Sequence, residues 1–370
     1  MPRLWLGYNP DVPVIGLLGL PGSGKSTVFK ALTHQAVPPQ FLGYDLKPHQ
    51  AVVKIPDARL DWLAEHYKSR NVVYATVEFI DIPGFDPAAT EAKLKNAVLE
   101  HYRRCDALVL VADMFSPEGR ARAARNVSVL LEELVLLDLV TAERQCAGLE
   151  KAAKHKADQE SVARYEALTR VKARLEEGEP VRGMELSHEE ERLLRDTAFL
   201  SEKQVILLLN VAEDDYAKAD AEIGGLSRVL ELADGEGLKV IRFAAELEAM
   251  LAGMEPNEAR EYMAEYGVTE PALKRFIRAA SECLSLVTFL TASDKESRAW
   301  TLRAGSNAQA AAGVIHSDLA RGFIRAETVA FDDLVQYGNL VAARGAGKVR
   351  LEGKDYIVAD GDVLHIRFNV

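Results

Sequence analysis

The stretch GLLGLPGSGKST, residues 16–27, decides how the rest of the chain is interpreted. Gly19 is followed by four residues and then by Gly24-Lys25-Ser26, which fits the pattern GxxxxGK(S/T). The apolar run VPVIGLLGL around its start predicts a buried strand, and STVFKALTHQ at its end predicts a helix. Glycines in such a turn let backbone N–H groups surround phosphate oxygens, and the helix N-terminus adds positive charge. The stretch therefore predicts a phosphate-binding loop.

Each residue of this loop has an expected role. Lys25 is expected to reach the β- and γ-phosphates, and the Ser26 hydroxyl is expected to bind Mg²⁺. The other predicted nucleotide-binding residues of the loop are Gly22, Ser23, Gly24 and Thr27. The alternative is a Gly-rich turn of structural use only, and the strand–loop–helix context favours phosphate binding.

A second motif, VEFIDIPGF, supplies a carboxylate. Asp81 closes a hydrophobic strand, where its side chain would hold the Mg²⁺ shell. Gly84, three residues later, offers a backbone N–H to a γ-phosphate, and with Lys25 it forms the predicted catalytic pair. Alone, the pattern DxxG is common and is also compatible with a simple strand-ending turn. After a P-loop and a strand, it indicates a nucleotide site.

The third motif, NVAED, concerns the nucleobase. Switch-type GTPases place NKxD at a strand end, where the Asp accepts two hydrogen bonds from guanine. Here Asn210 is kept, but Val211 replaces the Lys and Glu213 replaces the Asp. The longer Glu is expected to crowd the guanine amino group, so the sequence does not predict a preference for GTP. Val211 offers an apolar platform for a base, unless NVAED is only a polar loop. Ala244 and Ala245, which end the strand GLKVIRFAA, complete the predicted nucleotide-binding set.

Composition limits the other possibilities. The 370-residue chain has a formal net charge of -11, which disfavours a nucleic-acid coat over the whole molecule. Its three cysteines have no short spacing, which argues against a disulfide framework or a zinc site and for a reducing compartment. No run reaches the ~18 apolar residues of a membrane span. We therefore expect a cytoplasmic monomer without a signal segment or a membrane partner. Apolar strands separated by helical stretches predict an α/β fold with a parallel sheet.

Residues 116–200 interrupt the strand pattern. They contain long amphipathic runs, and Asn126 is the predicted N-cap of the first helix. Ser187 and Glu190 predict a capping box for a later helix. Because strands resume near Val205, we expect an antiparallel helical hairpin inserted within the α/β domain.

The chain from Leu286 onward predicts a small mixed unit. LVTFLTA and ESRAWTLR alternate like a hairpin, and KDYIVADGDVLHIRF predicts a second hairpin around Ala359–Asp362. Ten Lys and Arg balance ten Asp and Glu in this unit, so its net charge is zero. It lacks the acidity of the rest and is compatible with an anionic partner.

Several stretches resemble the YchF/Obg-like ATPase family. They are GLPGSGKST, IPDARLDWLAE, ATVEFIDIPGF, LEEGEPVRGMELSHEE and NVAE. The tail, from ESRAWTLRAGSN to VADGDVLHIRFNV, resembles the C-terminal TGS-type β-grasp domain of that family and is more specific than the P-loop. The resemblance implies a P-loop NTPase fold, resembling a G domain, divided into four segments. These are the first part of the NTPase domain (12–115), an inserted helical coiled-coil arm (116–200), the second part of the NTPase domain (201–285), and the TGS-type domain (286–370).

The resemblance also implies a function. It indicates a translation-factor-class ATPase that hydrolyses ATP slowly with Mg²⁺, uses GTP less well, and associates with ribosomes. The arm and the TGS-type domain would contact rRNA, although on the sequence alone the basic residues of the arm are better explained by solvated helix faces. Two alternatives remain open: a GTPase of the same class, and a nucleotide-gated interaction module with negligible hydrolysis.

Three motifs in the chain depart from common patterns. Gly22-Ser23 stand where the family has Asn-Val in the P-loop. Asp45 stands at the first-switch Thr, where it would either bind Mg²⁺ or repel the γ-phosphate. Phe85 stands where Ras-like enzymes have the Gln that orients water, which predicts slow intrinsic turnover.

Overall fold

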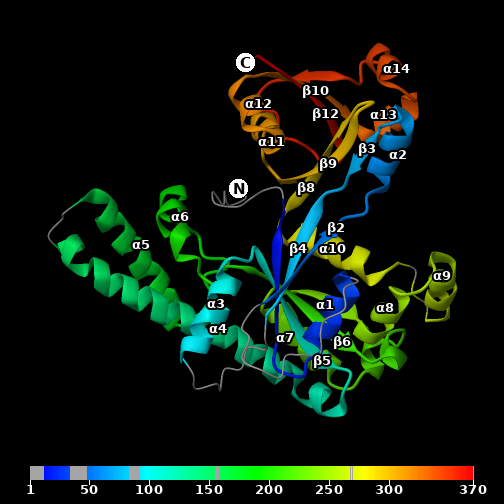
Figure 1. Cartoon of the computed structure of the whole chain (residues 1–370). Helices are drawn as coiled ribbons and strands as arrows, with labels where there is room; N and C mark the ends of the chain where they lie inside the picture. Colours follow the sequence, from blue (N-terminus) through cyan, green and yellow to red (C-terminus); the bar gives the residue numbers. More distant parts are fainter. Residues whose placement is uncertain are drawn as a thin grey trace.

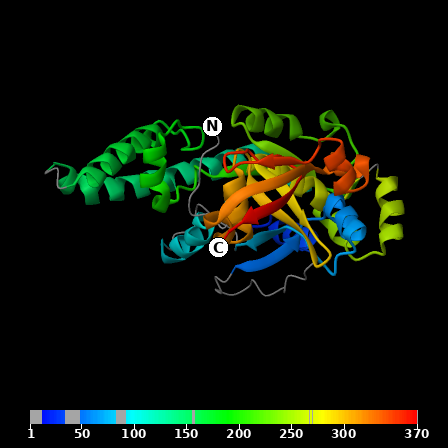
Figure 2. The same cartoon turned by 90° about the horizontal axis from the view of Figure 1, so that it is seen from above.

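The computed structural model describes residues 12–33, 48–82, 92–154, 158–266, 268 and 270–369. These residues form two six-stranded sheets with helices packed against them (Figure 1). A long helical arm extends to one side of both sheets, as the view from above also shows (Figure 2). Within the described ranges, no helix is long and apolar enough to span a membrane.

The first sheet has the strand order β2-β4-β1-β5-β6-β7. Its strands are β1 (Val14–Leu18), β2 (His49–Lys54), β4 (Thr76–Asp81), β5 (Ala107–Met114), β6 (Gln204–Val211) and β7 (Lys239–Phe243). All neighbours are parallel except β2, which runs antiparallel to β4. The central strands are almost continuous apolar runs because helices cover both faces of the sheet. The predicted parallel α/β fold is therefore confirmed.

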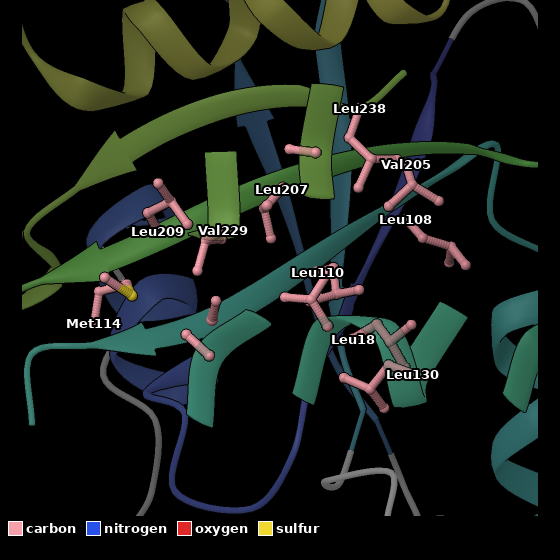
Figure 3. Close-up of a cluster of buried hydrophobic side chains, with 14 of the residues drawn as sticks. Leu18, Leu108, Leu110, Met114, Leu130, Val205, Leu207, Leu209, Val229 and Leu238 are labelled. Carbon is pink, nitrogen blue, oxygen red and sulfur yellow. The ribbon is translucent and has the colours of Figure 1, made fainter. Parts of the chain in front are cut away.

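Helices cover the two faces of this sheet. They are α1 (Lys25–Thr33), α3 (Ala92–Arg103), α7 (Leu226–Gly235), α8 (Ala245–Leu251), α9 (Pro256–Glu265) and α10 (Ala272–Cys283). On one face, Leu110 and Leu207 pack with Leu130 of α4 (Pro117–Lys154) and Val229 of α7 (Figure 3). On the opposite face, the core includes Phe29 of α1 and Phe276 of α10.

The arm is built on α4, whose 38 residues span about 57 Å at the usual rise per residue. Its second half packs against α5 (Gln159–Glu176) and α6 (His188–Leu194) through a buried cluster that includes Leu168 and Val171. Short 3-10 helices follow at η1 (Arg195–Thr197), η2 (Glu213–Asp215) and η3 (Asp220–Glu222). The predicted inserted hairpin is confirmed.

The capping predictions in the arm had different outcomes. The Ser187–Glu190 capping box is present, with hydrogen bonds of 2.8 and 3.3 Å. The N-cap predicted at Asn126 is wrong, because α4 begins nine residues earlier at Pro117. There the Ser116 hydroxyl accepts a 2.9 Å hydrogen bond from the backbone N–H of Gly119, and Pro occupies the first helical position.

The second sheet has the strand order β11-β10-β12-β8-β9-β3. Its strands are β3 (Asn71–Val73), β8 (Leu286–Ala292), β9 (Glu296–Arg303), β10 (Phe323–Ala330), β11 (Arg350–Glu352) and β12 (Asp362–Phe368). Its helices are α11 (Ala308–Ile315), α12 (Ser317–Arg321), α13 (Phe331–Tyr337) and α14 (Leu340–Gly345).

The two C-terminal hairpin predictions also had different outcomes. The β8–β9 hairpin is confirmed. The hairpin around Ala359–Asp362 is wrong, because the residues before it form a turn with only one bridge, between Ile357 and Asn307. The Asp362 carboxylate closes this turn by accepting hydrogen bonds from the Tyr356 hydroxyl and the Ala359 backbone. β12 pairs with β10 and β8 instead.

The segment between β2 and β4 contributes to the second sheet. It contains α2 (Ala58–Tyr67) and β3, and β3 pairs in parallel with β9. Leu60 and Leu63 of α2 are 0% exposed and belong to the same core as Leu290 and Val329. In Figure 1, α2 and β3 lie beside β9 and α13. These residues fall within the range 12–115 that the resemblance assigned to the NTPase domain, but they pack with the second sheet. The remaining domain limits stay predictions.

Candidate nucleotide-binding site

The predicted P-loop joins β1 to α1 at the carboxyl end of the parallel strands. Gly22 and Gly24 have positive φ angles of 82° and 86°, which the glycines in the motif allow. Gly24 also lies against β6: a Cβ there would be 2.3 Å from the Asn210 side-chain nitrogen. The loop therefore has the backbone conformation and the close approach that its glycines predict.

Lys25 is directed back over this loop. Its side chain is 7% exposed, and Nζ donates to the backbone oxygens of Gly19 at 2.9 Å and Leu20 at 3.1 Å. Burial lowers the pKa of Lys25 to about 8, while the charge of Asp81 acts in the opposite direction. Lys25 is thus held at the loop by weak neutral acceptors, which phosphate oxygens can replace.

Ser26, in the first turn of α1, contacts Asp81, the last residue of β4. The Ser26 hydroxyl donates a 2.9 Å hydrogen bond to the Asp81 carboxylate, which ends β4 and is 3% exposed. Burial raises the pKa of Asp81, and the Ser26 hydrogen bond and the Lys25 charge oppose that shift. These hard oxygen groups are of the kind that Mg²⁺ prefers, so the pair fits a magnesium site.

Asn210 links the loop to the end of β7. Its side-chain nitrogen donates to the Ser23 backbone oxygen at 3.3 Å, and its side-chain oxygen accepts from the Ala245 backbone N–H at 3.1 Å. Asn210 is 4% exposed, and Ala244 and Ala245 are each 1% exposed. The structure therefore brings three predicted segments together and gives Asn210 a positioning role that the sequence did not reveal. A direct contact of these residues with a base stays a prediction.

The other predicted site residues include Val211, Thr27, Gly84 and Asp45. Val211 is 3% exposed and packs in the core with Leu209, so its role as a platform for a base also stays a prediction. Thr27 lies on α1 and is partly exposed. Gly84 and Asp45 lie outside the described residues.

Glu213 has neighbours that sequence reasoning missed. It begins η2, and its carboxylate accepts a 3.3 Å hydrogen bond from the Tyr262 hydroxyl of α9. Tyr266, one turn later, also hydrogen-bonds to Glu213. The i, i+4 pair of aromatic residues was the available signal in the sequence.

This geometry defines a class of protein. A glycine-rich turn between β1 and α1, carrying a buried lysine and facing a carboxylate at the end of the neighbouring parallel strand, is the phosphate-binding arrangement of P-loop NTPases. A family model described as "50S ribosome-binding GTPase" matches residues 14–144. A second model, for the YchF-GTPase C-terminal region and described as a protein of unknown function, matches residues 286–369.

The chain belongs to the YchF family. It is 37% identical over 363 residues to "Ribosome-binding ATPase YchF" of Bacillus subtilis (strain 168), covering 96% of this chain and 99% of that protein. The protein of the same name from Escherichia coli O157:H7 is 39% identical over 363 residues, with the same coverage. "Obg-like ATPase 1" of Oryza sativa subsp. japonica is 34% identical over 365 residues, covering 96% and 92%.

A solved structure supports the same assignment. The Schizosaccharomyces pombe YchF GTPase superposes with a TM-score of 0.81 at 28% identity. The match covers 99% of this chain and 100% of that one, so it includes the P-loop sheet, the arm and the second sheet.

Proposed function

We propose that this chain binds ATP with Mg²⁺, hydrolyses it slowly and associates with ribosomes. The names of its relatives, which match over nearly their whole length, support an ATPase that binds ribosomes. The observation that carries the proposal is the 2.9 Å contact between Ser26 and Asp81. It puts a hydroxyl and a carboxylate beside the P-loop lysine, which is the combination that a magnesium-bound triphosphate requires.

Different residues of the site bind the phosphates and the magnesium ion. Lys25 leaves the Gly19 and Leu20 carbonyls and donates to phosphate oxygens, which are stronger acceptors because they are charged. Ser26 and Asp81 would hold Mg²⁺, which when bound would neutralise charge on the phosphates. The glycine backbone and the first turn of α1 supply N–H donors toward the same charge.

The preference for ATP over GTP is supported by Glu213. A guanine-reading carboxylate needs the length and freedom of an Asp, whereas Glu213 is longer and is hydrogen-bonded to Tyr262. We expect ATP to bind at least about tenfold more tightly than GTP. Calorimetry with both nucleotides and Mg²⁺ tests this expectation, and tighter binding of GTP would reject it in favour of a GTPase.

Slow hydrolysis is the second part of the proposal. The sequence places Phe85 where a water-orienting Gln would stand, so transition-state stabilisation rests on Lys25, Mg²⁺ and backbone N–H groups. Single-turnover phosphate release with Mg²⁺ and ATP, with and without ribosomes, measures it. Lys25→Ala is expected to abolish this release. Release that is unchanged in Lys25→Ala would reject the enzymatic function, and negligible release by the unmodified chain would favour a nucleotide-gated interaction module.

Ribosome association is the third part. Cosedimentation of the full chain with ribosomes, in the presence of ATP or ADP, tests it directly. We propose that the chain acts as a cytoplasmic monomer and that the arm and the C-terminal unit, which we assign as TGS-type, contact rRNA. Failure to cosediment in either nucleotide state would reject this part and leave ATP binding untouched.

A further inference from the structure

Helix α9 presents two tyrosines to the loop that follows β6. The Tyr262 hydroxyl donates to the Glu213 carboxylate at 3.3 Å, and Tyr266 hydrogen-bonds to the same side chain. The two hydroxyls are 3.5 Å apart, and the two rings lie 5.3 Å apart between centroids. One carboxylate therefore faces two hydroxyl donors carried on consecutive turns of one helix.

The backbone beneath Glu213 is fixed independently of these tyrosines. Asp215 is 4% exposed and forms ion pairs with Arg120 and with Lys218, the latter at 2.7 Å. Tyr216 is 8% exposed and its hydroxyl lies 3.4 Å from the Glu248 carboxylate. Since η2 is held by these contacts, the hydroxyls on α9 control mainly the direction of the Glu213 side chain.

The direction of the Glu213 side chain matters because guanine and adenine present different hydrogen-bonding groups. Guanine presents a ring N–H and an amino group as adjacent donors, which a free carboxylate accepts together. Adenine presents one amino group beside an acceptor nitrogen, so it gains nothing from a pair of acceptors. The hydrogen bond to Glu213 raises the pKa of Tyr266, and an unshifted tyrosine hydroxyl is already protonated at neutral pH, so both hydroxyls are available as donors.

We propose that Tyr262 and Tyr266 act as specificity-determining residues that engage the Glu213 carboxylate and so withhold it from guanine. This inference rests on the proposed ATP site and deepens it. The additional methylene of Glu213 would then serve to reach α9, and discrimination against GTP would depend on the tyrosine hydroxyls as well as on the length of the acid.

The test compares nucleotide binding by the full chain and the double variant Tyr262→Phe/Tyr266→Phe. Phe keeps the rings and their packing and removes only the two donors. Calorimetry with Mg²⁺ and non-hydrolysable analogues of ATP and GTP gives the two dissociation constants. We expect the double variant to bind the GTP analogue about tenfold more tightly than the unmodified chain does, with ATP binding changed by less than about twofold. Tyr165→Phe, on α5, makes the same chemical change away from the site and should alter neither constant.

A further variant separates this effect from a general loosening of the loop. Adding Glu213→Gln to the double variant removes the freed charge, so the gain in GTP binding should disappear. An unchanged ATP-to-GTP ratio in the double variant, or a gain that persists with Glu213→Gln, would overturn the inference. If the double variant does not fold, each single Tyr→Phe variant should give a smaller change in the same direction, and no change in either would also overturn it. A preference for GTP in the unmodified chain would instead reject the proposed function, and the inference with it.

Discussion

The guanidinium of Arg59, on α2, lies 2.6 Å from a carboxylate oxygen of Asp360, which is 301 residues further along the chain. The same guanidinium pairs with Asp57 at the start of α2, at 2.7 Å. The other carboxylate oxygen of Asp360 accepts a 2.7 Å hydrogen bond from the Thr288 backbone. These contacts join the turn before β12 to the segment between β2 and β4.

The same segment leads directly to the nucleotide site. β2 and β4 pair from Lys54 with Thr76 at one end to His49 with Asp81 at the other. The end at Asp81 faces the P-loop, and the opposite end continues into α2 and β3 of the second sheet. The strand that carries the predicted magnesium carboxylate is therefore continuous with the core of the C-terminal unit.

Substitutions in that shared core test this connection. We expect Leu63→Ala to lower the free energy of unfolding by about 2–5 kcal/mol, because the side chain is fully buried and its loss leaves a cavity. Urea unfolding measures the change. Val341→Ala is the control, because Val341 is 78% exposed and should cost less than about 0.5 kcal/mol. Equal stability of the two variants would mean that α2 does not support the C-terminal core.

The magnesium role of Asp81 predicts a specific response to chelation. Asp81→Asn keeps an acceptor for the Ser26 hydroxyl but removes the charge that attracts the cation. We expect Mg²⁺ to strengthen ATP binding by at least about tenfold in the unmodified chain and by much less in the variant. Calorimetry in Mg²⁺ and in EDTA gives both ratios. The same magnesium dependence in the two proteins would exclude Asp81 from the metal site.

Charge reversal is a better test of ribosome contact than truncation. A chain ending at residue 285 would expose Leu60 and Leu63, so its loss of binding would be ambiguous. Arg325 lies beside the turn that carries Lys354, since its guanidinium is 3.9 Å from the Cβ position of Gly353. We expect Arg325→Glu/Lys354→Glu to weaken cosedimentation with ribosomes, most strongly at low salt where phosphate contacts dominate.

The matched control reverses the charge of two exposed lysines that lie on the first sheet and on one of its helices. Lys239→Glu/Lys274→Glu makes the same change in net charge on β7 and α10, where the two ammonium groups pair with Glu282 and Glu270. It should cosediment as the unmodified chain does. Equal loss in the two double variants would show that total charge, and not the C-terminal surface, controls the association. ATP binding, measured in parallel, should change in neither.

Local motifs explain why the P-loop fold was predictable. Short patterns with a visible strand context place Ser26 and Asp81 at the same edge, because parallel strands bring their carboxyl ends together, and their magnesium role stays a prediction. The docking of α2 and β3 follows from no local pattern. IPDARLDWLAE is compatible with a helix, but its partners lie more than two hundred residues away, in β8, β9 and β10.

The incorrect predictions arose where side-chain contacts outweighed backbone patterns. The hairpin expected around Asp360 and Gly361 gave way to a turn closed by the Asp362 carboxylate. The cap expected at Asn126 was displaced because Ser116 and Pro117 start α4 earlier. In each case the competing side chain and its hydrogen-bond partners lie within six residues of each other, so a local side-chain hydrogen bond replaced the expected backbone pattern.

The lowered pKa of Lys25 predicts how ATP binding depends on pH. In the free protein burial sets this pKa to about 8, and charged phosphate oxygens would favour the protonated amine and raise it. Binding should therefore take up a proton above pH 8, and affinity should fall as pH rises, by up to about tenfold per pH unit. Without nucleotide, the folded chain binds fewer protons at Lys25 than the unfolded chain between about pH 8 and 10.5, so this residue's contribution to stability rises with pH there.

Calorimetry at pH 8.5, in two buffers with different ionisation enthalpies, measures the proton uptake directly. Lys25→Arg is the control, because a guanidinium remains charged throughout this range and has no proton to take up. We expect about half a proton or more for the unmodified chain and a clearly smaller value for Lys25→Arg. Identical uptake in both proteins would assign the proton to another group, and affinity that is constant from pH 7.5 to about 9.5 would mean that Lys25 does not contact the phosphates.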